Sequence, residues 1–200
     1  MFDEGTHWVA LGRIKGAFGV HGEVRVMPYQ LPIARVLPDP TPMPGFPVST
    51  LLESPVWRLG REVPAPREIK WHAGHLQGEY IHARLQGFET REEVQTLAGQ
   101  QVWVSAQIVP KLSVNQYYWF QLTGLTLLDV TQAPEEPRVQ ARVLARELGI
   151  VESLFATGSN DVLVVREHSG EERLIPFIHD TIVQVDLAAG AITARLMPGL

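Results

Sequence analysis

Short segments of alternating hydrophobic and polar residues fill the first half of the chain, and this pattern is typical of half-buried β-strands. The expected strands cover residues 8–14, 23–26, 51–53, 56–59, 68–75, 78–85 and 101–104. Thr90 and Glu93 have the spacing of a capping box, and Gly99 follows where the helix they predict would end. Short strands with one small helix predict a β-barrel.

The second half repeats this pattern. Strands are expected at residues 127–130, 149–155, 162–166, 172–177, 182–187 and 191–196. Residues 139–148 instead show helical spacing, with Val139, Val143 and Leu144 on one stripe. The prolines between Pro28 and Pro47 predict an extended connection. The expected fold class is therefore mainly β, with two small β-barrels in tandem and one or two short helices.

Four consecutive aromatic residues, Tyr117, Tyr118, Trp119 and Phe120, stand out between the two halves. In a strand, neighbouring side chains point to opposite faces, so one pair would enter a core and the other pair would point away from it. A neighbouring domain of the same chain could cover the outward pair. A partner protein could also cover part of it, because Tyr and Trp are favoured interface residues. The two interpretations are compatible.

Glycines recur around the first expected turn, at Gly12, Gly16, Gly19 and Gly22. They predict a tight loop over residues 15–22 between paired strands. The spacing matches neither of the common phosphate-binding glycine motifs. Between Gly5 and Arg35 the only acid is Glu23, and the cations are Arg13, Lys15, Arg25 and Arg35. This basic region, with His21 in the loop, is either a solvated rim or an edge that faces RNA or a substrate.

Charge and composition narrow the function further. The chain has 200 residues, enough for two small domains, and a net charge of −5. Residues 1–110 hold 10 Lys and Arg against 11 Asp and Glu, whereas residues 111–200 hold 7 against 11. An acidic second half favours a basic protein as its partner over RNA.

Several classes of site and compartment are not supported. Without cysteine the chain has no disulfides and no thiolate sites, and it shows neither a signal-peptide pattern nor an apolar run of the ~20 residues that span a bilayer. These features predict a cytoplasmic protein. His72, His75 and His82 lack an acidic companion at ligand spacing, so they are expected to be surface or hydrogen-bonded histidines and not metal ligands. Common hydrolase motifs are missing, so no enzyme is expected.

Taken in order, several motifs resemble the RimM family of bacterial ribosome-maturation factors. They are residues 11–14, 16–26, 90–99, 117–125, 149–151, 157–165 and 174–187. The resemblance implies an N-terminal six-stranded barrel (residues 1–108), a linker (109–115) and a C-terminal PRC-barrel (116–200). It also implies a cofactor-free, non-enzymatic monomer that binds free small ribosomal subunits and assists head assembly and rRNA processing.

The partner implied by the resemblance is the nineteenth small-subunit protein, a basic head protein, with Tyr117 and Tyr118 implicated in the contact. The sequence departs from the family at Gln121, where an acid is common, and at Thr123, where an aliphatic residue is common. The tracts 38–47 and 131–148 are longer than usual. Two alternatives stay open, a small cofactor- or ligand-binding β-barrel and a general PRC-barrel interaction module.

Overall fold

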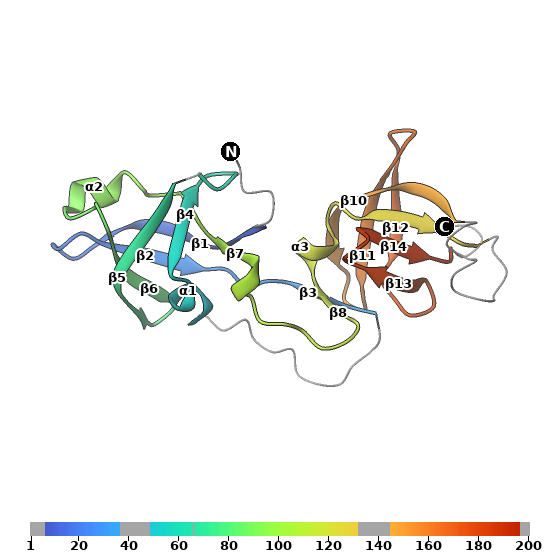
Figure 1. Ribbon diagram of the computed structural model, residues 1–200, viewed down its shortest axis with the longest axis horizontal. Coiled ribbons are helices and arrows are strands. Elements are labelled where there is room, and N and C mark those ends of the chain that lie inside the picture. Colours follow the sequence, from blue (N-terminus) through green and yellow to red (C-terminus); the bar gives the residue numbers. More distant parts are fainter. Residues whose placement is uncertain (1–6, 37–48, 66, 132–144, 197–200) are drawn as a thin grey trace. The chain divides into compact units, whose positions relative to one another are not determined.

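The computed structural model describes residues 7–36, 49–65, 67–131 and 145–196, arranged in two compact units (Figure 1). The first unit comprises Met1–Leu31 and Pro44–Lys111, and the second comprises Pro32–Met43 and Leu112–Leu200. A short piece of the N-terminal half therefore belongs to the second unit. The extended proline-rich connection predicted over residues 38–47 and the part of the predicted helix up to residue 144 lie outside the described residues.

The first unit is a closed barrel of six antiparallel strands. In their order around the barrel these are β1 (Trp8–Phe18), β2 (Glu23–Pro28), β6 (Tyr80–Leu85), β5 (Glu68–Gln77), β4 (Val56–Gly60) and β7 (Gln101–Ser105). The barrel closes where β7 pairs with β1, with Val9 opposite Val104. Alternation sends Val24 and Val26 of β2 into the interior, and a register shift between Ala10 and Gly12 lets both Leu11 and Ile14 of β1 be buried there. The six-stranded barrel expected from the sequence is confirmed.

Two helices of the first unit show where local patterns succeed and fail. The helix α2 (Arg91–Gln95) begins as predicted, because the Thr90 hydroxyl accepts a hydrogen bond from the Glu93 N–H and the Glu93 carboxylate accepts one from the Thr90 N–H. The strand expected at residues 51–53 is wrong, because these residues form the end of helix α1 (Ser49–Glu53). The buried Trp57 indole N–H donates to the Leu51 carbonyl and anchors this helix.

The first hairpin is tighter than expected. Strand β1 continues to Phe18 through a register shift between Ile14 and Gly16, so the turn occupies only residues 19–22. A bulge of this kind adds one residue to a strand without ending it. The loop predicted over residues 15–22 was therefore too long by the four residues that stay in the strand.

The second unit contains a six-stranded sheet. Its strands, in spatial order, are β12 (Glu172–Pro176), β11 (Asp161–Glu167), β10 (Arg146–Ala156), β9 (Thr126–Asp129), β14 (Ala191–Ala194) and β13 (Ile182–Asp186). Strands β14 and β9 pair in parallel, and the other neighbours pair antiparallel. The helix expected over residues 139–148 is wrong for residues 146–148, which begin β10.

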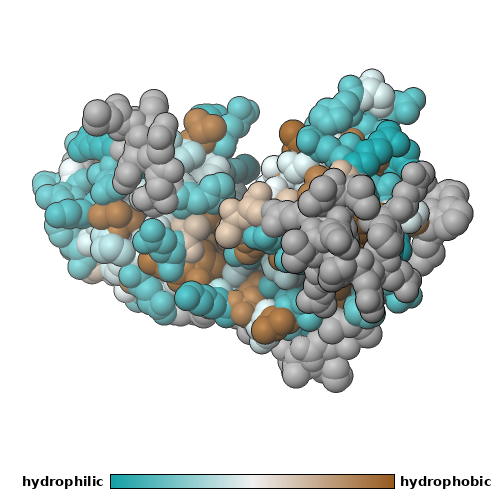
Figure 2. Space-filling model, turned by 45° about the vertical axis from the view of Figure 1, so that its right-hand side comes forward, coloured by the Kyte–Doolittle hydropathy of each residue, from teal (hydrophilic) through white to brown (hydrophobic). Residues whose placement is uncertain are grey.

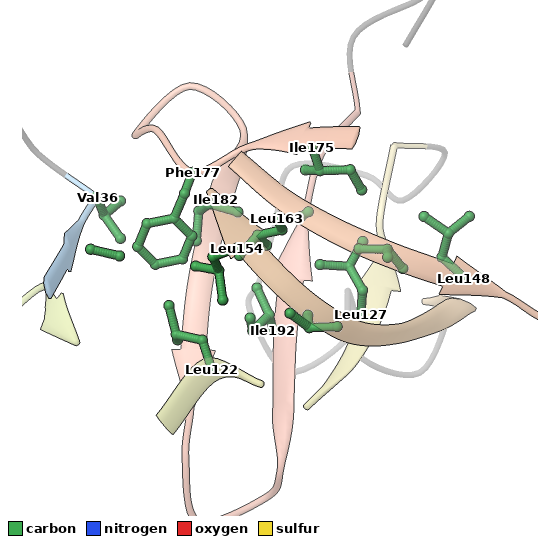
Figure 3. Close-up of a cluster of buried hydrophobic side chains, with 14 of the residues drawn as sticks. Val36, Leu122, Leu127, Leu148, Leu154, Leu163, Ile175, Phe177, Ile182 and Ile192 are labelled. Atoms are coloured by element: carbon green, nitrogen blue, oxygen red, sulfur yellow. The ribbon is translucent and has the colours of Figure 1, made fainter. Parts of the chain in front are cut away.

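Hydrophobic side chains from all parts of the second unit meet in one core (Figure 3). In that view Phe177, Leu163, Leu154 and Ile182 point toward one another, and Val36 lies beside Phe177. Val36 comes just after β3 (Ile33–Arg35), which pairs antiparallel with β8 (Gln116–Tyr118) in a separate two-stranded ribbon. The first half of the chain thus supplies part of the second unit's core.

Candidate binding surfaces

The run of four aromatic residues is not one strand. Its first two residues end β8, and the next two begin the short helix α3 (Trp119–Leu122). The Tyr118 N–H donates to the Gln121 side chain at 2.9 Å, and the Trp119 N–H donates to the Pro32 carbonyl at 3.1 Å. The expected strand is therefore wrong at Trp119 and Phe120, because Gln121 caps the Tyr118 N–H and the Thr123 N–H donates back to the Trp119 carbonyl, as in a helical turn.

Two of the four aromatic side chains pack on the second unit's core. Tyr117 meets Phe177 edge to face, with ring centroids 6.1 Å apart. Trp119 packs against the same core. Burial raises the pKa of Asp161, and the neighbouring Trp119 side chain acts in the opposite direction. Tyr117 and Trp119 therefore contribute to the packing of the second unit.

The other two aromatic side chains stack on each other. The rings of Tyr118 and Phe120 are 5.3 Å apart and nearly parallel, at 12°. Tyr118 is only 4% exposed, whereas Phe120 is half-buried. Burial raises the pKa of both Tyr117 and Tyr118. The predicted division into two pairs is thus found, although a strand followed by a helix produces it.

Gln121 and Thr123, the two residues at which the sequence departs from the family pattern, follow this aromatic run, and each makes a hydrogen bond to it. Gln121 accepts the Tyr118 N–H, as described above, and the Thr123 hydroxyl donates to the Trp119 carbonyl at 3.1 Å. An acidic side chain at position 121 could accept the same bond, so the departure preserves the backbone geometry. Thr123 and Gly124 are exposed at the end of α3.

The basic residues proposed to face RNA come from one hairpin of the first unit. Arg13 and Lys15 are exposed on β1, and Arg25 lies on the neighbouring strand β2. The Arg25 guanidinium sits over the Tyr80 ring, 5.0 Å from its centroid, in a cation–π contact. His21 is exposed in the turn of the hairpin. The fold therefore gathers these four residues on neighbouring strands and their connecting turn.

The glycines of this hairpin do serve its shape. Gly16, Gly19 and Gly22 have positive φ angles, which favour glycine over other residues. At Gly22 a β-carbon would also lie 2.7 Å from the Glu89 backbone, and at Gly12 it would lie 2.8 Å from the Val26 side chain. Side chains at these two positions would separate segments that pack closely.

Sequence reasoning missed a cluster of rings on the first barrel. His82 is buried, and its Nδ1 has no hydrogen-bond partner among the described residues, so the expectation of a surface or hydrogen-bonded histidine is wrong for it. Its ring meets Phe18 at 4.0 Å and stacks on His75 at 5.5 Å. The alternation of Tyr80, His82 and Arg84 along one strand was the available signal for this face.

The rest of the described surface offers few other sites. Within the residues that the structure describes, no three His, Asp or Glu side chains are grouped to hold a metal ion. None of the described helices is long and apolar enough to cross a membrane. On the face seen in Figure 2, hydrophobic surface occurs as separate patches between hydrophilic ones.

Comparisons with known proteins find relatives along nearly the whole chain. A family profile described as the RimM PRC barrel domain matches residues 119–200. Ribosome maturation factor RimM of Pseudomonas savastanoi is 32% identical over 91% of this chain and 88% of its own length. The protein of the same name from Ectopseudomonas mendocina is 34% identical over the same shares. A crystal structure of RimM from Pseudomonas aeruginosa, 28% identical, covers 97% of this chain and 100% of its own, with a TM-score of 0.41.

Proposed function

This chain belongs to the RimM family, and from that membership we propose that it is a ribosome maturation factor that binds free small ribosomal subunits and assists assembly of their head and processing of their rRNA. The observation that carries the proposal is the similarity to ribosome maturation factors over 91% of the chain and 88% of the relative. The protein acts by binding and not by catalysis, and it works as a cytoplasmic monomer.

The protein partner that we propose is the basic head protein, the nineteenth of the small subunit, and the second unit binds it. The acidic balance of residues 111–200, with 7 Lys and Arg against 11 Asp and Glu, supports a basic partner. Strands β10 to β12 and their turns carry five glutamates: Glu147, Glu152, Glu167, Glu171 and Glu172. Arg166 pairs with Glu152 and Glu172 on one face of these strands, and Arg173 pairs with Glu167 on the other.

The docking segment in this proposal is residues Tyr117, Tyr118, Trp119 and Phe120. Because Tyr117 and Trp119 pack on the core, their replacement by Ala would disturb the fold as well as any contact. Phe120 is the best residue to change, since it is half-buried and its ring stacks on that of Tyr118. It presents an aromatic surface of the kind that dominates interfaces.

The experiment compares Phe120→Ala with Leu187→Ala, a large exposed residue between β13 and β14 of the same unit. Binding to purified small subunits and to the isolated head protein is measured by sedimentation and by calorimetry. Phe120→Ala should weaken both by about tenfold, the usual loss at an aromatic anchor, and Leu187→Ala should leave both within about twofold. Equal binding by the two variants would remove the aromatic segment from the docking surface.

The first unit, in the same proposal, lies near rRNA through Arg13, Lys15, His21 and Arg25. A double charge reversal, Arg13→Glu with Lys15→Glu, tests this without touching Arg25, which packs on Tyr80. The reversal should weaken subunit binding most at low salt, because phosphate contacts depend on released counterions. The matched control is Arg61→Glu with Arg67→Glu, which reverses two exposed charges elsewhere on the same unit. If both reversals have the same effect, the basic hairpin is not the rRNA-facing surface.

A further inference from the structure

One face of the first barrel carries a group of rings that the proposed function leaves unassigned. We call it the ring cluster; it consists of Phe18, Arg25, His75, Tyr80 and His82. On β6 the buried Ile81, Ala83 and Leu85 occupy the interior, so Tyr80, His82 and Arg84 face outward. In the sheet register Arg25 of β2 and His75 of β5 stand on either side of His82. Four strands therefore contribute to one outward row.

The centre of this cluster is a polar group that the protein does not satisfy. His82 is 3% exposed although it lies on the outward face, because Phe18 and His75 pack on its ring. Among the described residues, neither its Nδ1 nor the buried Nε of Arg25 has a hydrogen-bond partner. A buried polar atom without a partner is energetically costly, so such atoms often mark a position where a ligand supplies the bond.

The net charge of the three strands β1, β2 and β6 is opposite in sign to that of the whole chain. Strands β1, β2 and β6 carry four cations, Arg13, Lys15, Arg25 and Arg84, and the single carboxylate Glu23. That carboxylate is bound to Arg84 at 3.1 Å, whereas the net charge of the protein is −5. A sheet face with local positive charge and accessible aromatic rings fits an anionic ligand that also presents flat surfaces.

We propose that this face binds single-stranded RNA, with a base stacked on Phe18 and the adjoining phosphates held by Arg25 and by Lys15 or Arg13. Phe18 is 38% exposed, so part of its ring is free to stack while its edge contact with His82 holds it in place. Bases that are not paired stack on aromatic side chains, and cations track the backbone between them. The inference builds on the proposed function, in which the first unit lies near rRNA, and identifies the RNA as unpaired and the contact as stacking.

An acidic peptide is the competing kind of ligand. An acidic peptide would form ion pairs with the cations, but Phe18 would add little to its affinity, since carboxylates do not stack on an aromatic face. Duplex RNA would likewise reach the cations but not offer a free base. The contribution of Phe18 therefore distinguishes unpaired RNA from both.

The test uses the full chain and a fluorescently labelled 12-nucleotide single-stranded RNA of mixed sequence, with binding followed by fluorescence anisotropy. Phe18→Ala should weaken binding about 5- to 150-fold, the range expected for one lost base stack. The control Leu76→Ala removes a more exposed hydrophobic side chain, at 51%, from strand β5 of the same unit and should change binding less than twofold. Arg25→Gln should lower the slope of log affinity against log salt by about 1.

Three results would overturn the inference: equal losses in Phe18→Ala and Leu76→Ala, equal binding of a duplex of the same length, or displacement of the RNA by a glutamate oligopeptide at similar concentration. Circular dichroism checks that each variant is folded.

Sedimentation with small subunits is run in parallel to separate the two proposals. Loss of oligonucleotide binding by a Phe18→Ala protein that still sediments with subunits through its second unit supports the inference, whereas a wild-type chain that binds no subunits refutes the proposed function alone.

Discussion

His82 shows how a single residue links the fold of the first unit to pH. Burial is the main cause that lowers its pKa below 6.5; the neighbouring His75 and Arg25 lower it further, and Glu23 raises it. Between that lowered pKa and 6.5 the unfolded chain binds a proton that the folded chain does not. The stability contributed by neutral His82 is therefore fully present above pH 6.5 and is lost as the pH falls through this window.

The first prediction is therefore that the free energy of unfolding of the first unit falls as the pH falls, and this unit can be followed separately from the second. Four of the five tryptophans lie in that unit, so a Trp119→Phe background makes fluorescence report on it. Urea unfolding at pH 7.5, 6.5 and 5.5 should show a falling free energy of unfolding. His82→Leu should flatten the fall, whereas His72→Leu, at an exposed position on β5, should not. A pH profile unchanged by His82→Leu would contradict the assignment.

Thr90 provides a second prediction at the residue scale. Its hydroxyl accepts the Glu93 N–H at 3.3 Å, and the Glu93 carboxylate accepts the N–H groups of Glu89 and Thr90 at 2.9 and 3.0 Å. The hydrogen bonds to the carboxylate, first that from the Thr90 N–H and then that from the Glu89 N–H, lower the pKa of Glu93. Thr90→Ala should lower the free energy of unfolding of the first unit by about 1 kcal/mol in denaturant titrations. Glu92→Gln, in the same helical turn, should change it by only a few tenths of a kcal/mol, and a similar loss in both would argue against the cap.

At the scale of elements, the strands with long alternation were predictable and the short ones were not. Strand β6 and the capped helix α2 follow from local rules, because alternation and a capping box each need only a few adjacent residues. Residues 51–53 are too few to distinguish a strand from a helix, and there the bond from Trp57 to Leu51 decides. The helix expected over residues 139–148 rested on Val139, Val143 and Leu144, which lie outside the described residues. In β10 itself, Leu148 and Gly149 are both buried at a register shift between Glu147 and Gly149, and this interrupts the alternation that would have marked a strand.

The candidate sites divide in the same way. The division of the aromatic run into Tyr117 with Trp119 and Tyr118 with Phe120 was predicted, although a helix and not continued strand alternation completes it. Local charge grouped Arg13, Lys15 and Arg25, which lie on neighbouring strands, but it wrongly included Arg35, which lies on β3 of the second unit. The ring cluster could not be assembled from local sequence, because Phe18, His75 and His82 meet only through the register of non-adjacent segments. Strand β3 was not predicted for the same reason, because most of the first barrel separates it in the sequence from its partner strand, Gln116–Tyr118.

Strand β3 carries the third prediction. Ala34 is fully buried in the second unit's core and stands opposite Tyr117 in the ribbon. Ala34→Asp places a charge among apolar side chains and should lower the free energy of unfolding of the second unit by about 3 kcal/mol or more. Hydrogen exchange should then accelerate in β10 and β11 but not in β1 and β2.

The control for this substitution is Ala188→Asp, which introduces the same charge at an exposed position of the second unit. It should leave exchange in β10 and β11 unchanged. Faster exchange in the first unit, with the second unaffected by Ala34→Asp, would mean that β3 stabilises a different part of the molecule from the one its pairing indicates.

At the scale of the whole molecule, the two units differ in charge and in the kind of surface they offer. The first has a cationic hairpin beside stacked rings, although its half of the sequence is almost balanced in charge. The second has an acidic excess and a two-stranded ribbon whose aromatic residues are partly built into its core. Such a division suits a factor that meets a basic protein with one unit and RNA with the other.

Sedimentation of a tagged copy through sucrose gradients tests this proposed function most directly. Fractions of a cell lysate are probed for the tag beside free small subunits, large subunits and whole ribosomes. The proposed function predicts that the protein migrates with free small subunits only, and that Phe120→Ala shifts most of it to the top of the gradient while Leu187→Ala does not. Wild-type protein that stays at the top at low salt, or that migrates with large subunits, would contradict it.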